Sequence, residues 1–171
     1  LPEERFKALQ EQVAEYSQAV QDEANIKSML ENVKGRQEEA KATQELASIE
    51  FNRAREEVVA HMQRRKQHVE YMDDLYEEAR VKAELMEDEV ARANKIASLN
   101  RVYDRKEDGS KSDRLVEREN NITQALKKAQ EARNEALKQS DKARERYDIE
   151  SESVKQLTKQ LEQAQNRVKS Y

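Results

Sequence analysis

Two histidines on one helical segment, His61 and His68, are the first residues whose chemistry suggests a site, because neutral imidazole is a common metal ligand. Seven residues of helix separate them by about 10 Å, which is too far for one ion to bridge. The neighbouring Arg64 and Arg65 add positive charge that would repel a cation. We therefore expect no metal site. The absence of cysteine also removes thiolate ligands and nucleophiles.

Carboxylates are abundant, and the runs Glu77-Glu78 and Glu87-Asp88-Glu89 could in principle supply acid–base groups. Catalysis needs a concave, partly dry pocket that shifts their pKa values, and a pair of long helices offers none. Glycine-rich phosphate loops and serine nucleophile motifs are absent as well. We expect solvated acidic faces, no enzyme activity and no cofactor.

Three basic clusters could bind phosphate groups: Arg64-Arg65-Lys66, Arg105-Lys106 and Lys127-Lys128. Acidic residues such as Asp104 and Glu107-Asp108 lie among them, and no aromatic residues alternate with them to stack on bases. A nucleic-acid partner is therefore disfavoured. An anionic membrane surface receives only weak support, because the basic residues are not gathered on one face.

Composition places these residues on helices rather than in a globular core. Of the 171 residues, 40% are charged and 36% are hydrophobic, with two glycines, one proline and no tryptophan. The few large apolar residues are spread as stripes, so they can be buried only helix against helix. No apolar run approaches the roughly 18 residues that a membrane span requires.

Apolar residues recur at alternating steps of three and four, which is the sequence signature of a coiled coil. The C-terminal seam reads Ile122, Leu126, Ala129, Arg133, Ala136, Ser140, Ala143, Tyr147, Glu150, Val154, Leu157, Leu161, Ala164, Val168 and Tyr171. A middle seam reads Val69, Met72, Tyr76, Ala79, Ala83, Met86, Val90 and Ala93. Between Val58 and Val69 the spacing gains a residue, a stutter that locally unwinds the supercoil.

One stretch, residues 101–113, contains Gly109 and lacks apolar spacing, so it predicts a hairpin turn. The expected fold is therefore all-α: a long antiparallel coiled-coil helical hairpin with an N-terminal helical extension. Its first arm covers 44–103, its turn 104–112 and its second arm 113–171. Ser110 and Ser112 are equally good candidates to cap the second arm.

The expected extension, residues 1–43, begins with Pro2, which suits the first turn of a helix. It either continues through Gly35, which we favour because the register survives there, or turns at Gly35 to give a short third helix. In the predicted register this segment has no opposite arm, so we expect it to mediate self-association. The residues assigned to that contact are Phe6, Leu9, Val13, Tyr16, Val20, Leu30 and Val33.

In an antiparallel helix pair, the two residues that pack opposite each other in one core layer have numbers that add up to a constant. Sums of about 212 and about 219 both fit the seams. Both registers bring Arg65 within one layer of Glu150. A charged residue in each seam, opposite in sign, would penalise slipped pairings. We therefore expect Arg65 and Glu150 to form a register-setting pair, although two side chains that reach separately into water are the open alternative.

The favoured function is a non-catalytic coiled-coil scaffold segment of a larger protein, cytoplasmic, homodimeric and in contact with other proteins. A membrane-curvature (BAR-like) helical dimer module is the first alternative, and a receptor-binding coiled-coil hairpin of a bacterial toxin is the second. Under the second, the hairpin tip makes the contact. The tip residues expected to meet a partner are Tyr103, Arg105, Lys106 and Lys111.

Overall fold

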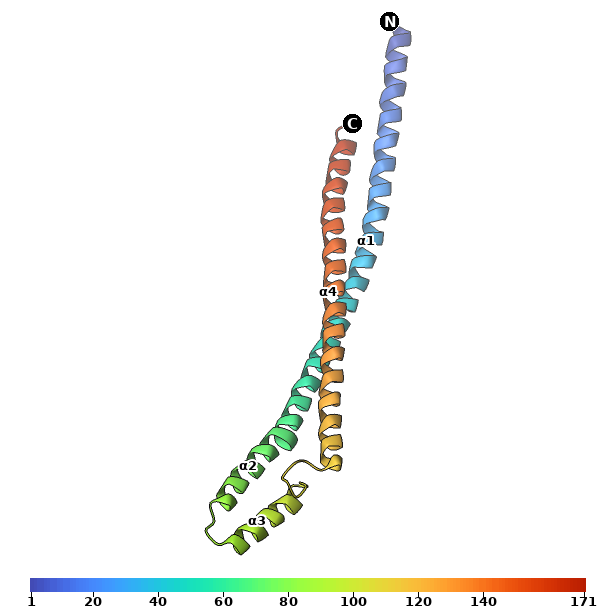
Figure 1. Cartoon of the computed structure of the whole chain (residues 1–171). Helices are drawn as coiled ribbons and strands as arrows, with labels where there is room; N and C mark the ends of the chain where they lie inside the picture. The colour runs from blue at the N-terminus through green and yellow to red at the C-terminus, as the bar shows by residue number, and fades with distance from the viewer. The chain divides into compact units, whose positions relative to one another are not determined.

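The computed structural model describes residues 1–171 and contains helices and loops but no strand. The helices are α1 (Pro2–Arg65), α2 (Tyr71–Glu84), α3 (Glu89–Val102) and α4 (Asp113–Lys169), and a π-helical turn, η1 (Lys66–Glu70), joins α1 to α2 (Figure 1). The chain forms two compact units, one of residues 1–49 and 138–171 and one of residues 50–137. The predicted all-α helical hairpin is confirmed.

In the first unit, α1 and α4 run side by side in opposite directions (Figure 1). Leu30 and Val33 of α1 are buried against Leu157 of α4, and Val154 and Leu161 pack around them. Helix α1 continues unbroken through Gly35, as the favoured alternative predicts. The apolar stripes that define the seams therefore form the contact between the two helices.

The register differs from both predicted ones. Arg36 binds Glu150, with Nε 3.4 Å from Oε2, and Arg167 donates to Asp22 over 3.3 Å. These partners have numbers that sum to 186 and 189 rather than about 212 or 219. Leu30 and Val33, expected to pair with a second chain, are consequently covered by α4 of the same chain.

The predicted pair of Arg65 with Glu150 is replaced by two separate ion pairs. Glu150 binds Arg36, whereas Arg65 places Nη1 3.9 Å from Oε1 of Glu70. The register shift explains the change, because Glu150 now lies level with residues near 36 on α1. The charge of each residue is balanced inside its own unit.

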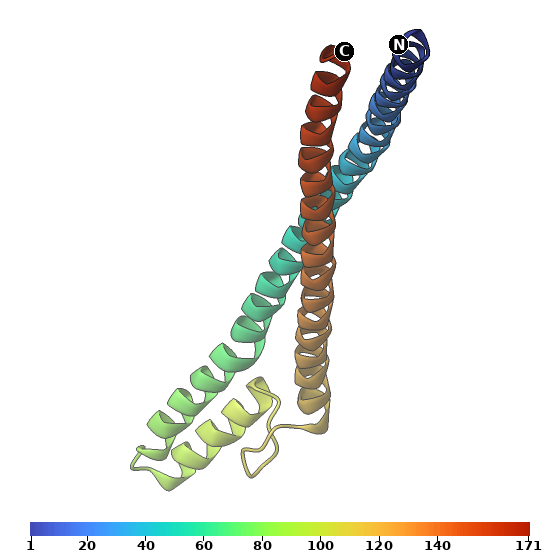
Figure 2. The same cartoon turned by 90° about the horizontal axis from the view of Figure 1, so that it is seen from above.

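The second unit contains a turn that the seam does not predict. Helix α2 ends at Glu84 and α3 starts at Glu89, so the expected single arm 44–103 breaks at residues 85–88. Asp88 caps α3 by accepting a hydrogen bond from the Val90 backbone N–H at 3.1 Å. Helix α3 folds back beside α2 (Figure 2). This doubling back removes residues from the arm, which is why the predicted register is wrong.

The π-helical turn η1 lies where the seam gains a residue. Val58 is buried against Leu126 and Ala129 of α4, and the next buried residue on this part of the chain is Val69, eleven positions later. A π turn inserts one residue into a helix and so rotates the following side chains back to the same face. The stutter in the sequence therefore has a local structural counterpart at Lys66–Glu70.

Candidate functional site

The connection between α3 and α4, residues 103–112, has a fixed conformation. Asp104 and Gly109 have positive φ angles of 56° and 87°. The Lys106 N–H donates to the Ser110 carbonyl at 2.7 Å, and the Ser112 N–H donates to the Asp104 carbonyl at 3.1 Å. The Ser112 hydroxyl also accepts from the Leu115 N–H and so caps α4. Of the two candidate caps, Ser112 is the one the structure uses.

A buried polar network joins α2, α3 and this loop. Asn100 is buried, and its side-chain oxygen accepts a 2.6 Å hydrogen bond from the Tyr76 hydroxyl. Arg80 donates to the same hydroxyl at 2.8 Å, and the Asn100 carbonyl accepts from the Arg105 N–H at 2.7 Å. Since buried polar groups are costly when unpaired, these bonds fix the loop against the α2–α3 pair.

Arg105 and Lys111 attach the loop to neighbouring helices through acidic residues. Arg105 Nη2 lies 3.1 Å from Asp73 Oδ1, and Lys111 Nζ lies 2.9 Å from Asp73 Oδ2 and 2.7 Å from Glu119 Oε2. Partial burial pulls the pKa of Lys111 down, but the hydrogen bonds to Glu119 and Asp73 push it up by more. The net effect is a raised pKa, so Lys111 stays charged at neutral pH.

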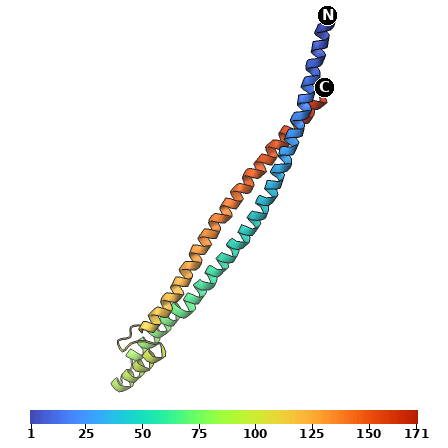
Figure 3. The ribbon, with the colours of Figure 1, turned by 90° about the vertical axis from the view of Figure 1, so that its right-hand side faces the viewer.

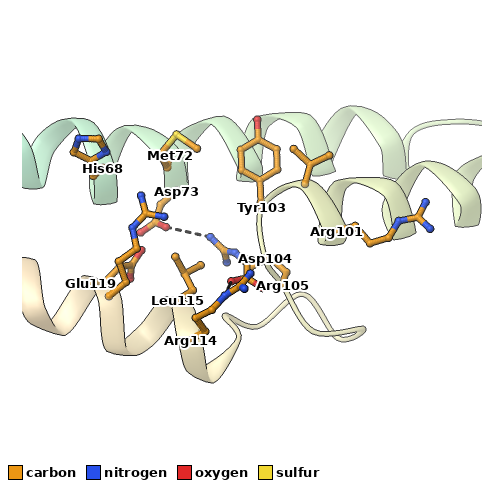
Figure 4. Close-up of a pocket in the computed structure, with 12 residues that line it drawn as sticks. His68, Met72, Asp73, Arg101, Tyr103, Asp104, Arg105, Arg114, Leu115 and Glu119 are labelled. Carbon is orange, nitrogen blue, oxygen red and sulfur yellow. Dashed lines mark hydrogen bonds and ion pairs between the residues drawn. The ribbon is translucent and has the colours of Figure 1, made fainter.

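A hollow of about 340 Å³ opens between the loop and the adjoining helices (Figure 4). Its lining residues are His68, Met72, Asp73, Arg101, Val102, Tyr103, Asp104, Arg105, Arg114, Leu115, Arg118 and Glu119. Asp104 accepts a 3.0 Å hydrogen bond from Arg114 Nε at its edge. This bond, followed by one with Ser112, lowers the pKa of Asp104.

The chemistry available in this hollow is that of fixed charges. Asp73, Asp104 and Glu119 each accept a hydrogen bond from a cationic side chain, so the oxygens of all three are engaged in ion pairs. The described residues contain no group of three His, Asp or Glu side chains placed to hold a metal ion. The arrangement can position charged groups, and its unpaired basic members can attract anions.

The four residues predicted to contact a partner at the hairpin tip have different environments. Arg105 and Lys111 are engaged in the ion pairs above. The Tyr103 ring packs edge-on against Tyr76, with centroids 5.6 Å apart. Lys106 is exposed and binds Asp113 at 3.3 Å. The structure thus gives three of them an internal role, and a partner contact for any of the four stays a prediction.

The N-terminal residues predicted to mediate self-association divide into covered and uncovered members. Tyr16 meets Tyr171 edge-on at 5.9 Å between ring centroids, so α4 reaches this level of α1. Phe6, Leu9 and Val13 lie beyond it and are 62%, 59% and 63% exposed. Figure 3 shows the start of α1 extending past the C-terminus. The uncovered extension is therefore about 1–15 rather than 1–43.

Two surface features were not identified from the sequence because each combines residues far apart in the chain. One is a hollow of about 410 Å³ at the end of α4, lined by Leu9, Gln12, Val13, Tyr16, Val168, Lys169 and Tyr171. The other, lined in part by Arg64 and Arg118, is treated below. The apolar spacing of Phe6, Leu9 and Val13 predicts the side of the first hollow that α1 forms. Its other half depends on the register, which the sequence does not reveal.

Comparison with known proteins adds no assignment to this geometry. The chain matches no family model, no curated protein and no solved structure. Separately, none of the helices is both long and apolar enough to pass through a bilayer. The function has to be argued from the surfaces themselves.

Proposed function

We propose that this chain is a non-catalytic coiled-coil scaffold segment that forms a homodimer through the start of α1 and presents its remaining faces to other proteins. The observation that carries this proposal is the exposed stripe of Phe6, Leu9 and Val13, which continues past the end of α4. Three large apolar side chains at coiled-coil spacing on a bare helix favour burial against another helix.

The partner that fits this stripe is the same segment of a second copy. The stripe is continuous with the α1–α4 contact, since Leu9, Val13 and Tyr16 line one hollow together with Val168 and Tyr171. A second helix laid along α1 would fill this hollow and continue the line of α4. In an antiparallel two-fold arrangement, Phe6 of each copy faces Leu9 of the other, and the same patch serves both chains.

Sedimentation velocity over a range of concentrations tests the dimer. The variant with Phe6→Gln, Leu9→Gln and Val13→Gln should sediment as a monomer, whereas the wild type should shift from monomer to dimer as concentration rises. The matched control carries Leu46→Gln, Ile49→Gln and Val59→Gln, three exposed apolar residues elsewhere on α1. It should dimerise like the wild type. A wild type that stays monomeric, or dimers of equal strength in all three proteins, would contradict the proposal.

The scaffold role also includes a cytoplasmic location and contacts with further proteins. Its support is the surface that the helices leave open, since 40% of the residues are charged and many large apolar side chains are exposed. Cell fractionation tests the location. Proximity labelling from the N-terminus of the wild type and of the Gln-substituted stripe variant would separate partners that need the dimer from those that do not.

A further inference from the structure

A second hollow in the unit of residues 50–137 is lined mainly by arginines. It measures about 410 Å³, and its charged lining comprises Arg64 from α1 and Arg114, Glu117 and Arg118 from α4. Asn121 and Ile122 complete it. Residues 114, 118 and 121 recur at steps of four and three, so one face of α4 supplies them. Three arginines from two helices thus line one depression.

Only one of these three arginines forms an ion pair within the protein. Arg64 and Arg118 make no ion pair. Arg114 uses Nε to bind Asp104, which leaves its two terminal nitrogens available. Glu117 is the only acidic residue in the lining. Arginines that line one hollow and outnumber its carboxylates repel one another, and an anion bound among them would relieve that repulsion.

The positive surface continues into the neighbouring hollow. Arg114 and Arg118 line both depressions, and His68 lies on the helix opposite Arg114 in the second one (Figure 4). The acids in that second hollow are already engaged: Asp73 and Glu119 by Arg105 and Lys111, and Asp104 by Arg114. The unengaged charge along this surface is therefore predominantly positive.

We propose that Arg64, Arg114 and Arg118 form a binding site for a ligand that carries clustered phosphate monoesters. Guanidinium groups bind phosphate oxygens in a planar, two-pronged geometry, and they are always charged. A phosphate monoester carries about −1.5 to −2 charges and three acceptor oxygens at neutral pH, so two adjacent groups match three arginines better than a carboxylate does. This site is separate from the stripe proposed for dimerisation.

Titration calorimetry with inositol hexakisphosphate tests the site on the intact chain. We expect saturable binding with one ligand per chain. The variant Arg64→Gln with Arg118→Gln leaves the Arg114–Asp104 pair intact, and it should weaken binding by about a hundredfold or more, because two bonds to a charged group are lost together. Adding Arg114→Gln should remove measurable binding. Circular dichroism establishes that the variants remain helical.

The matched control is a variant with the same loss of three charges elsewhere: Arg5→Gln, Arg144→Gln and Arg146→Gln, all exposed. It should bind within about twofold of the wild type, a difference of roughly 0.4 kcal/mol. If the control loses as much affinity as the site variant, binding is a general charge effect and the proposal is wrong. A wild type with no saturable binding would also overturn it.

The phosphates can come from a soluble molecule or from a lipid headgroup. Co-sedimentation with vesicles of phosphatidylcholine and phosphatidylinositol bisphosphate, compared with vesicles of phosphatidylcholine and phosphatidylserine, separates these sources. Binding only to the phosphoinositide vesicles, lost in the site variant, supports a headgroup as the ligand. Calorimetric binding without vesicle binding supports a soluble ligand. Equal sedimentation of the site variant and the wild type would show that the arginines do not recognise the headgroup.

Discussion

Arg105 lies over the ring of Tyr76, with its Cζ atom 4.2 Å from the ring centroid, while its Nη2 binds Asp73. The side chain is only 11% exposed. Stacking on the ring and pairing with a carboxylate are both stronger when water is excluded. One residue of the α3–α4 loop is thus held by a cation–π contact and by an ion pair, both to the helix formed by residues 71–84.

Removal of this contact should destabilise the unit of residues 50–137. We expect Arg105→Ala to lower the free energy of unfolding by about 1–3 kcal/mol, because the stack, the ion pair and a charged hydrogen bond are lost together. The free energy of unfolding of Arg105→Lys should lie between those of the wild type and Arg105→Ala, since an ammonium keeps the charge but not the planar stack. Urea unfolding followed by circular dichroism measures both.

Arg53→Ala is the control for this loss. Arg53 is 67% exposed and pairs with Glu50 within one helix. Surface pairs of this kind contribute little, so the change should stay within about 0.5 kcal/mol. Equal losses for Arg105→Ala and Arg53→Ala would show that the contacts of Arg105 with Tyr76 and Asp73 contribute no more stability than a surface ion pair.

The carboxyl of Asp104 should titrate below its ordinary value of 3.8 in the folded chain, because the Arg114 and Ser112 hydrogen bonds favour its charged form. A lowered pKa means that this carboxylate stabilises the fold above the unfolded pKa, and that the contribution is lost as pH falls through the folded pKa. Acidification below about pH 4 should therefore loosen the start of α4 first. Carboxyl carbon shifts measured by NMR across that range give the titration midpoint.

Arg114→Gln should raise the pKa of Asp104 towards its ordinary value. Asp108 serves as the internal reference, since its pKa is lowered by hydrogen bonds from the Ser110 side chain and backbone and not by Arg114. Its midpoint should stay where it is in the wild type. If both carboxyls shift equally, the effect is a general loss of positive charge and the Asp104–Arg114 hydrogen bond is not its cause.

The two turns show most clearly how much of the fold can be predicted from the sequence. The segment before Asp113 is recognisable because Gly109 and a lack of apolar spacing mark it, and α4 begins at Asp113. The turn at residues 85–88 has neither glycine nor proline, and Met86 and Val90 keep the heptad spacing across it. Asp88, a good N-cap, is its only local signal. A prediction that overlooks this turn places the pairing of α1 with α4 about 25 residues or more away from the observed register.

The charged sites show a similar limit. Arg105-Lys106 is visible as a basic pair, but its partner Asp73 lies 32 residues earlier and comes close only because α3 folds back on α2. Arg64 and Arg118 line the same hollow for a related reason, since the register that follows from this turn brings α1 beside that part of α4. Patterns along one helix predict faces, whereas contacts between helices depend on the register. A single missed turn therefore leaves the fold class correct and the site pairs wrong.

Truncation of Leu157 tests the α1–α4 contact in the unit that contains the termini. Leu157 is buried against Leu30 and Val33, so Leu157→Ala should cost about 2–4 kcal/mol through lost burial and the cavity left behind. Leu46→Ala makes the same chemical change at a side chain that is 66% exposed, and it should be nearly neutral. Thermal unfolding measures both. Comparable losses at the two sites would contradict the observed register.

The two glycines should respond to alanine with opposite signs. Gly35 lies inside α1 with open space around it, so Gly35→Ala should raise the free energy of unfolding by about 0.5–1 kcal/mol through helix propensity. Gly109 has a φ of +87°, and an added Cβ would collide with the Arg80 guanidinium that donates to Tyr76. Gly109→Ala should therefore destabilise the loop by about 1–2 kcal/mol through backbone strain and the displaced hydrogen bond.

Hydrogen exchange separates this local effect from a general one. Gly109→Ala should speed exchange at the Lys106 and Ser112 amides, which donate across the loop, and leave the amides around Gly35 unchanged. Gly35→Ala should slow exchange only in α1. Because the two substitutions add the same methyl group, opposite signs can arise only from backbone conformation and the space around each Cα. A stabilising Gly109→Ala would contradict the expected backbone strain and the expected collision of the added Cβ with Arg80.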